Sequence, residues 1–322
     1  MAKNVLVLVH GMVPSRTPST SRKEYADFRE GMLRAEPTLA QALEPVVEVS
    51  WGHEQPDQQV ERHDQKLTRA QQQVADRVEY DAVRSQPSPN NVLLTGVFGR
   101  DYAVVPPMRF ISKGIREGIV QFGLADAMYY ASADGEKRVR ATIYEQILEG
   151  LGAPGGAGET RLHVVCHSLG VAVMHDFLYG LFHSGDAAPD FLNQATNEVA
   201  QRYGEWRENA KNETLKLGTL VTMASQLPLF HMRKQTLVDR FYLGKTLDAK
   251  EIGVAGDAVR WLNFYDVDDI LGFATRPLYG DDPAIKELQV DTGDNPISAH
   301  TAYWHNKTVT RESARLILKN CS

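Results

Sequence analysis

Short runs of apolar residues, rich in β-branched side chains, recur along the chain between longer segments with helical spacing. A run of this length that is apolar on both faces is typical of a strand buried in a parallel sheet. The pattern predicts such strands over 4–9, 46–51, 161–166, 217–224 and 258–265. Residues 91–97 fit either a further strand or a buried turn.

Helices are expected between these strands, because apolar residues there recur at intervals of three and four. In 137–151, for example, Val139, Ile143 and Ile147 fall on one face of a helix. The spacing predicts helices over 22–43, 109–130, 137–151, 171–182 and 308–318. Strands that alternate with helices indicate an α/β fold, with a mostly parallel central sheet flanked by helices.

Two polar segments interrupt this alternation. Residues 52–91 are rich in Gln, Asp, Arg and Glu, and they fit either one or two solvated helices with a loop or a lid over a site. Residues 180–216 are polar and helical in pattern. We expect a single domain over 1–322, with helical insertions at about 52–130 and 181–214 that form a cap or lid.

Composition and charge narrow the function classes. The 322 residues include 35 basic and 41 acidic side chains, a net charge of −6, which argues against nucleic-acid binding driven by general basicity. Cys166 and Cys321 form no CxxC pair, so neither a disulfide framework nor a thiolate zinc site is expected. Apolar runs are too short for a signal peptide or a membrane span, which predicts a cytoplasmic protein with no integral membrane segment. The oligomeric state is left open.

The candidate chemistry begins at Ser168, which lies between a predicted strand and an apolar helix. The segment VVCHSLG matches the nucleophile-elbow pattern G-x-S-x-G, with Cys166 in place of the first glycine and Gly170 at the second. In that pattern a sharp turn from strand to helix exposes the serine hydroxyl, and the helix N-terminus favours a developing negative charge. The alternative is that Ser168 caps the helix, since serine is a preferred N-cap residue.

Two backbone N–H groups are candidates for an oxyanion hole. The first is that of Leu169, which directly follows the serine. The second is that of Met12, in the loop after the first strand, where Gly11 permits a close approach of the backbone. The alternative for Gly11 is a simple turn. His10 is expected to hold this loop by hydrogen bonds.

A carboxylate that orients a catalytic histidine is expected in the loop after the strand 258–265. The sequence NFYDVDDILG offers Asp266, Asp268 and Asp269 there. Such a group must accept a hydrogen bond from the imidazole and be partly buried. Asp268 is favoured, because the apolar residues that follow can anchor its loop, and Asp269 is the alternative.

The base is expected last in the chain. The segment NPISAHTAYWHNK offers His300 and His305. His300 is favoured, because it lies among small residues in a loop before the final helix. The order Ser168, Asp268, His300 is the one expected when the serine sits on a nucleophile elbow.

Five segments in the same order, VLVLVHGM, VVCHSLG, LVTMASQLPL, NFYDVDDILG and AHTAYW, resemble the α/β-hydrolase superfamily. Within it, the chain is similar to bacterial lipase- and esterase-like proteins. Cys166 departs from the elbow pattern. In LVTMASQLPL, Ala224 and Gln226 stand where lipase-like proteins commonly have Gly and Pro.

The resemblance implies an α/β-hydrolase fold and a serine hydrolase that cleaves a carboxylic ester through an acyl-enzyme. Ser168 would be the nucleophile, His300 the base, and Asp268 or Asp269 the acid. A small-molecule or lipid-like ester is the implied substrate, and no metal or cofactor is needed. An acyltransferase with the same triad and a non-catalytic binding protein of the same fold are the alternatives.

Overall fold

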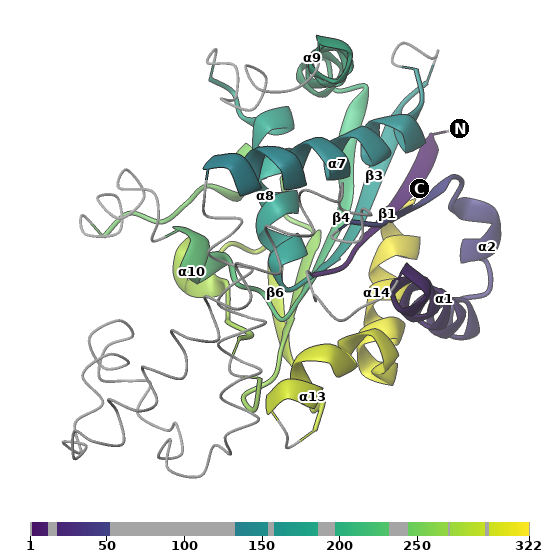
Figure 1. The fold of residues 1–322 in the computed structure, drawn as a ribbon, viewed down its shortest axis with the longest axis vertical. Coiled ribbons are helices and arrows are strands. Elements are labelled where there is room, and N and C mark those ends of the chain that lie inside the picture. Colours follow the sequence, from purple (N-terminus) through teal and green to yellow (C-terminus); the bar gives the residue numbers. More distant parts are fainter. Residues whose placement is uncertain are drawn as a thin grey trace, which may run out of the picture. The chain divides into compact units, whose positions relative to one another are not determined.

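A six-stranded, all-parallel β-sheet runs through the centre of the described chain (Figure 1). The structure is a computed structural model, and the residues that it describes are 2–11, 18–51, 133–153, 158–185, 197–231, 244–269, 271–293 and 296–321. The strands are β1 (Lys3–Val9), β2 (Val46–Val49), β3 (Thr160–His167), β4 (Leu215–Met223), β5 (Trp261–Tyr265) and β6 (Ile285–Gln289). Their order across the sheet is β2-β1-β3-β4-β5-β6.

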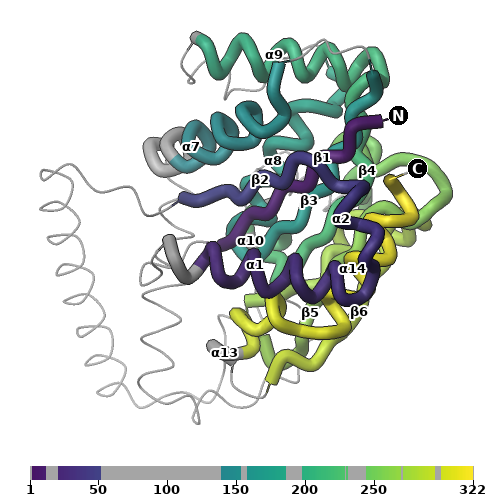
Figure 2. The backbone as a smooth tube through the Cα atoms, turned by 90° about the vertical axis from the view of Figure 1, so that its right-hand side faces the viewer, coloured from purple at the N-terminus to yellow at the C-terminus, as the bar shows by residue number. Residues whose placement is uncertain are grey.

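Helices cover both faces of the sheet (Figures 1 and 2). One face carries α7 (Ala133–Leu151), α8 (Leu169–Phe182) and α9 (Asn197–Lys211), and the other carries α1 (Pro18–Ala35) and α14 (Lys307–Asn320). The shorter elements are α2 (Leu39–Ala42), α10 (Leu227–His231), η5 (Ala249–Ile252), α12 (Arg276–Tyr279), α13 (Pro296–Thr301) and η6 (Ala302–His305). Among the described helices, none is long and apolar enough to cross a bilayer. The architecture is an α/β fold, as expected.

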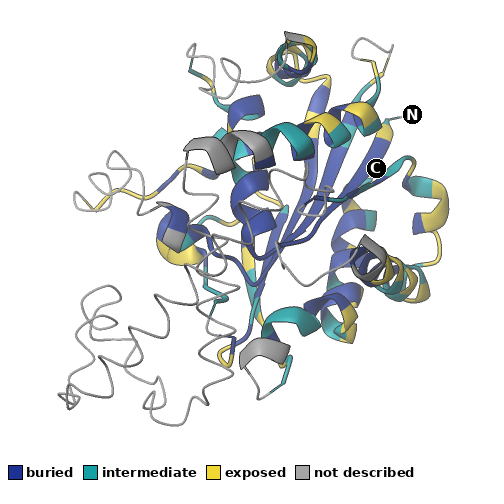
Figure 3. Ribbon diagram, in the orientation of Figure 1, coloured by how far each residue is buried: buried dark blue, intermediate teal, exposed yellow. Residues whose placement is uncertain are grey.

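The alternation of side chains along each strand divides the core into two layers. In β1, Val5, Val7 and Val9 pack toward α7 and α8, whereas Leu6 and Leu8 pack toward α1 and α14. The central strands β1, β3, β4 and β5 are therefore largely buried on both faces, as Figure 3 shows by their dark blue colour. This double burial is the reason that the strand sequences are continuously apolar.

The structure departs from the predicted elements in two places. The helix expected over 22–43 is split into α1 and α2, because Pro37 cannot continue a helix and disfavours helical geometry in the residue before it. The edge strand β6 was not predicted, because its sequence IKELQ has exposed polar residues and no apolar run. The elements expected at 91–97 and 109–130, and the insertion at about 52–130, lie outside the described residues.

A buried histidine lies on β3, on the side of the sheet that faces α14. His163 is fully buried, and its Nε2 lies 3.3 Å from Asn4 Oδ1 and 3.8 Å from Cys321 Sγ. Burial, together with the charges of Arg161 and Arg260, lowers the pKa of His163 to about 3. The imidazole is therefore neutral in the folded protein at any pH near neutrality.

Acid should destabilise the fold through this residue. In the unfolded chain His163 takes up a proton below its ordinary pKa of 6.5, whereas the folded state does so only near 3. The contribution of His163 to the free energy of unfolding is therefore complete above pH 6.5. It is lost as the pH falls from there toward 3, by about 1.4 kcal/mol for each pH unit. Urea unfolding at several pH values should show a shallower loss in His163→Gln than in the wild type. Equal slopes would contradict this account.

Candidate active site

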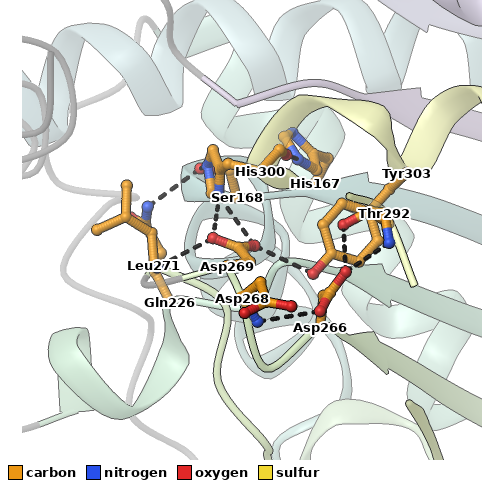
Figure 4. A network of polar contacts seen from close by, with 10 residues as sticks. All are labelled: His167, Ser168, Gln226, Asp266, Asp268, Asp269, Leu271, Thr292, His300 and Tyr303. Atoms are coloured by element: carbon orange, nitrogen blue, oxygen red, sulfur yellow. Dashed lines mark hydrogen bonds and ion pairs between the residues drawn. The ribbon is translucent and has the colours of Figure 1, made fainter. Parts of the chain in front are cut away.

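The polar residues singled out in the sequence meet where the strands end, at the carboxyl edge of the sheet (Figure 4). Ser168 directly follows β3, and the loop that starts at Asp266 directly follows β5. His300 comes from α13 and reaches the same place. This edge is where sites form in parallel α/β sheets.

Ser168 occupies a sharp turn between β3 and α8. Its backbone has φ 55° and ψ −127°, a conformation that favours glycine and strains an L-residue. The Ser168 N–H donates to the carbonyl of Met223 at 2.9 Å, which ties the turn to the end of β4. Ser168 stands at the N-cap position of α8, yet its side chain makes no capping hydrogen bond. The hydroxyl therefore does not stabilise the start of α8 and is available for other hydrogen bonds.

Two glycines permit the close packing around this turn. A Cβ at Gly11 would lie 2.6 Å from Ser168 Cβ and 3.0 Å from its Oγ, so the chain after β1 passes against the serine. A Cβ at Gly170 would lie 2.7 Å from the carbonyl oxygen of His10. His10 is buried, its N–H donates to the Tyr25 hydroxyl at 2.7 Å, and its carbonyl accepts from Trp51 at 2.9 Å. The two hydrogen bonds of His10 hold the end of β1 so close to Ser168 and α8 that only glycine fits at positions 11 and 170.

The hydroxyl of Ser168 meets the imidazole of His300. The distance from Ser168 Oγ to His300 Nε2 is 2.8 Å. On the other side of the ring, Nδ1 lies 2.9 and 3.1 Å from the two carboxylate oxygens of Asp269. Because a carboxylate can only accept, Nδ1 carries the ring hydrogen, and Nε2 is left to accept from the serine hydroxyl. His167 Nε2, 2.6 Å from the carbonyl of His300, fixes the backbone behind the ring.

The structure brings Asp269 to the histidine and leaves Asp268 outside. The Asp269 side chain is fully buried, whereas Asp268 is exposed and its N–H donates to Asp266 Oδ1 at 3.0 Å. Asp266 in turn accepts from the N–H and hydroxyl of Thr292, at 2.5 and 2.6 Å. This anchor fixes the loop so that Asp269 faces inward. The sequence-based preference for Asp268 is thus corrected to its alternative.

The Asp269 carboxylate accepts two further hydrogen bonds. The Leu271 N–H donates to Oδ1 at 3.0 Å, and the Tyr303 hydroxyl donates to Oδ2 at 3.0 Å. Burial and the charge of Asp269 raise the pKa of Tyr303 far above its usual range, so this phenol stays a donor. Tyr303 belongs to the segment AHTAYW, but the sequence pattern assigned it no role. Its position three residues after His300, where the two share one helical side, is the signal that could have found it.

The two expected oxyanion donors differ in what the structure shows. Leu169 is the first residue of α8 and directly follows Ser168, so its N–H is among those without a partner inside the helix. Met12 lies outside the described residues. Its neighbour Gly11 is the last described residue of that segment and packs against Ser168.

Cys166 fits the turn without disturbing it. Its side chain is fully buried in the layer with α8, and Sγ lies 3.5 Å from the carbonyl of Val221. Burial raises the pKa of the thiol far above its usual range, so the group is a packing residue and an inert thiol. Within the described ranges, no cluster of His, Cys, Asp or Glu has the arrangement to hold a metal ion.

The described site therefore consists of a hydroxyl, an imidazole and a buried carboxylate in a continuous chain of hydrogen bonds. Such a chain can transfer the hydroxyl proton to the imidazole while the carboxylate holds the ring and stabilises its positive charge. No family model, curated protein or solved structure matches this chain.

The strained turn generates a stability prediction. Because Ser168 does not cap α8, we expect Ser168→Ala to change the free energy of unfolding by less than about 0.5 kcal/mol. Ser168→Gly should raise it by about 1 kcal/mol, because the positive φ is no longer strained. Asn306 is the matched control, since its side chain does cap α14 by accepting from Thr308 and Val309 at 2.9 and 3.2 Å.

Asn306→Ala should cost about 1 kcal/mol, the usual price of a lost N-cap. Chemical denaturation of the three variants checks this contrast. A loss in Ser168→Ala equal to that in Asn306→Ala, with no gain in Ser168→Gly, would show that the serine is an ordinary cap.

Proposed function

We propose that this protein is a serine hydrolase of the α/β-hydrolase type that cleaves carboxylic esters, with Ser168 as nucleophile, His300 as base and Asp269 as the orienting acid. The observation that carries the proposal is the Ser168 hydroxyl. It stands at a helix N-cap in a strained turn, makes no cap, and lies 2.8 Å from an imidazole backed by a buried carboxylate. A structural serine would need neither the strain nor these partners.

In the acylation step, Ser168 Oγ attacks the ester carbonyl carbon while its proton moves to His300 Nε2. The resulting oxyanion would be stabilised by the Leu169 N–H and by a second N–H from the loop after β1. The imidazolium then gives its proton to the leaving alcohol, and the bond between the carbonyl carbon and the alcohol oxygen breaks. Asp269 keeps Nδ1 protonated throughout, because it holds the ring in the required tautomer.

In the deacylation step, water attacks the acyl-enzyme and His300 Nε2 accepts one of its protons. The bond from the carbonyl carbon to Ser168 Oγ breaks, and the proton returns to Oγ. The choice of an ester rests on the resemblance of the five segments to lipase- and esterase-like proteins. The order of strands, with the serine after β3 and the acid after β5, is compatible with that fold.

A fluorophosphonate probe tests the proposal. We expect a covalent adduct on Ser168, located by peptide mass spectrometry, because the probe reacts with serines activated in this way. His300→Ala should abolish labelling, since no base then removes the proton. Ser168→Ala should lower hydrolysis of chromogenic esters by at least about 10⁴-fold. His305→Ala is the control and should label like the wild type, because that histidine is paired with Asp27 away from the serine.

An unlabelled Ser168 in correctly folded protein would contradict the proposal and favour a non-catalytic binding protein. Hydrolysis that persists in Ser168→Ala would also contradict it. If the probe labels Ser168, product analysis with added alcohols separates a hydrolase from an acyltransferase. Free acid as the product in the presence of an acceptor is the result that we expect.

A further inference from the structure

Gln226 meets Ser168 from the side opposite the chain that follows β1. It comes three residues after β4 ends, directly before α10, and is 3% exposed. Its backbone carbonyl accepts from the Phe230 N–H in α10 at 3.2 Å. The sheet order places β1 and β4 on either side of β3, which carries Ser168 at its end. Gln226 and Gly11 therefore approach the serine from opposite flanks.

The contact between the two side chains has a fixed direction. Gln226 Nε2 lies 3.1 Å from Ser168 Oγ (Figure 4). The serine hydroxyl has one hydrogen, which is directed to His300 Nε2 at 2.8 Å. Oγ can then only accept from the glutamine, and an amide nitrogen can only donate. Gln226 is thus a donor to the oxygen that would attack the substrate.

We infer that Gln226 is a further catalytic residue, which donates to Ser168 Oγ in the reaction proposed above; the inference rests on that proposed function. In the resting protein the amide and the imidazole together fix the hydroxyl, so that its proton points at His300. As the proton leaves, the Gln226 N–H stabilises the negative charge that develops on Oγ. In deacylation Oγ is the leaving group, and the same donor stabilises it as its bond to the acyl carbon breaks.

This role differs from that of an oxyanion hole. The donors from Leu169 and from the chain after β1 would face the carbonyl oxygen of the substrate, whereas Gln226 contacts the nucleophile itself. A neutral amide suits the position, because it supplies a hydrogen bond without a charge. A carboxylate there would place an acceptor against the lone pairs of Oγ and oppose the attack.

The experiment measures the second-order rate constant for phosphonylation of Ser168 in the full chain, with the fluorophosphonate probe over a range of pH. The variants are Gln226→Met, which keeps the length and removes the donor, and Gln226→Glu, which replaces it by an acceptor. We expect Gln226→Met to react at least about 10-fold more slowly than the wild type, and Gln226→Glu more slowly still.

Gln146 provides the matched control. It lies on α7, and its side-chain amide donates to the carbonyl of Ser50 at 2.8 Å and accepts from the Ser50 N–H at 2.9 Å, just after β2. Gln146→Met removes hydrogen bonds of the same kind away from the site, and its phosphonylation rate should equal that of the wild type. Thermal unfolding of each variant confirms that the reacting protein is folded, and the nearly isosteric Gln226→Glu serves if Gln226→Met does not fold.

The pH profile separates the proposed role from a structural one. If Gln226 acts on Oγ, the rate of Gln226→Met falls at every pH and the apparent pKa of the base stays where it is in the wild type. If the residue only supports the loop, Gln226→Met displaces His300 and shifts that pKa, which would overturn the inference. Gln226→Glu is compared by its rate alone, because its added negative charge acts on the imidazole directly. A rate in Gln226→Met within twofold of the wild type would also overturn it, while the proposed function stands. An unlabelled wild-type Ser168 would instead be a failure of the proposed function.

Discussion

The site depends on one backbone constraint, the turn that Ser168 makes between β3 and α8. At φ 55° and ψ −127° the residue is strained, and its side chain is turned away from the helix that it would otherwise cap. The strain is held by an almost fully buried strand on one side and a largely buried helix on the other. The N–H bond to Met223 adds a tie to β4. Packing of these two elements in the core therefore stabilises the strained turn, which holds the Ser168 hydroxyl next to His300 and Gln226.

The second element of the account is the buried carboxylate of Asp269. It lies in a fully buried position and accepts from the imidazole, from Tyr303 and from the Leu271 N–H. An unpaired charge at that depth would be costly, so the three donors and the carboxylate specify one another's positions. This network fixes the His300 ring and its tautomer in the free protein. With Gln226 on the other side of Oγ, the hydroxyl has a single direction to point.

Burial decides how much of this could be predicted from the sequence. Strands buried on both faces, such as β1 and β3, leave continuous apolar runs, whereas β6 at the edge was found only through its pairing with β5. Ser168 and His300 stood out by order and context. Between the adjacent residues Asp268 and Asp269 the sequence pattern cannot choose, because the inward direction depends on a bond from a distant residue, Thr292, to the same loop. Such long-range contacts leave no local signal.

The most direct test compares the two neighbouring aspartates by kcat/KM for a chromogenic ester, with Asp268→Asn as the control for Asp269→Asn. The account predicts a loss of about 10³-fold or more in Asp269→Asn, because the amide no longer holds His300 in the required tautomer. Asp268→Asn should stay within about threefold of the wild type, because that side chain is exposed and does not touch the ring. Equal activity in both variants, or the larger loss in Asp268→Asn, would contradict the central claim.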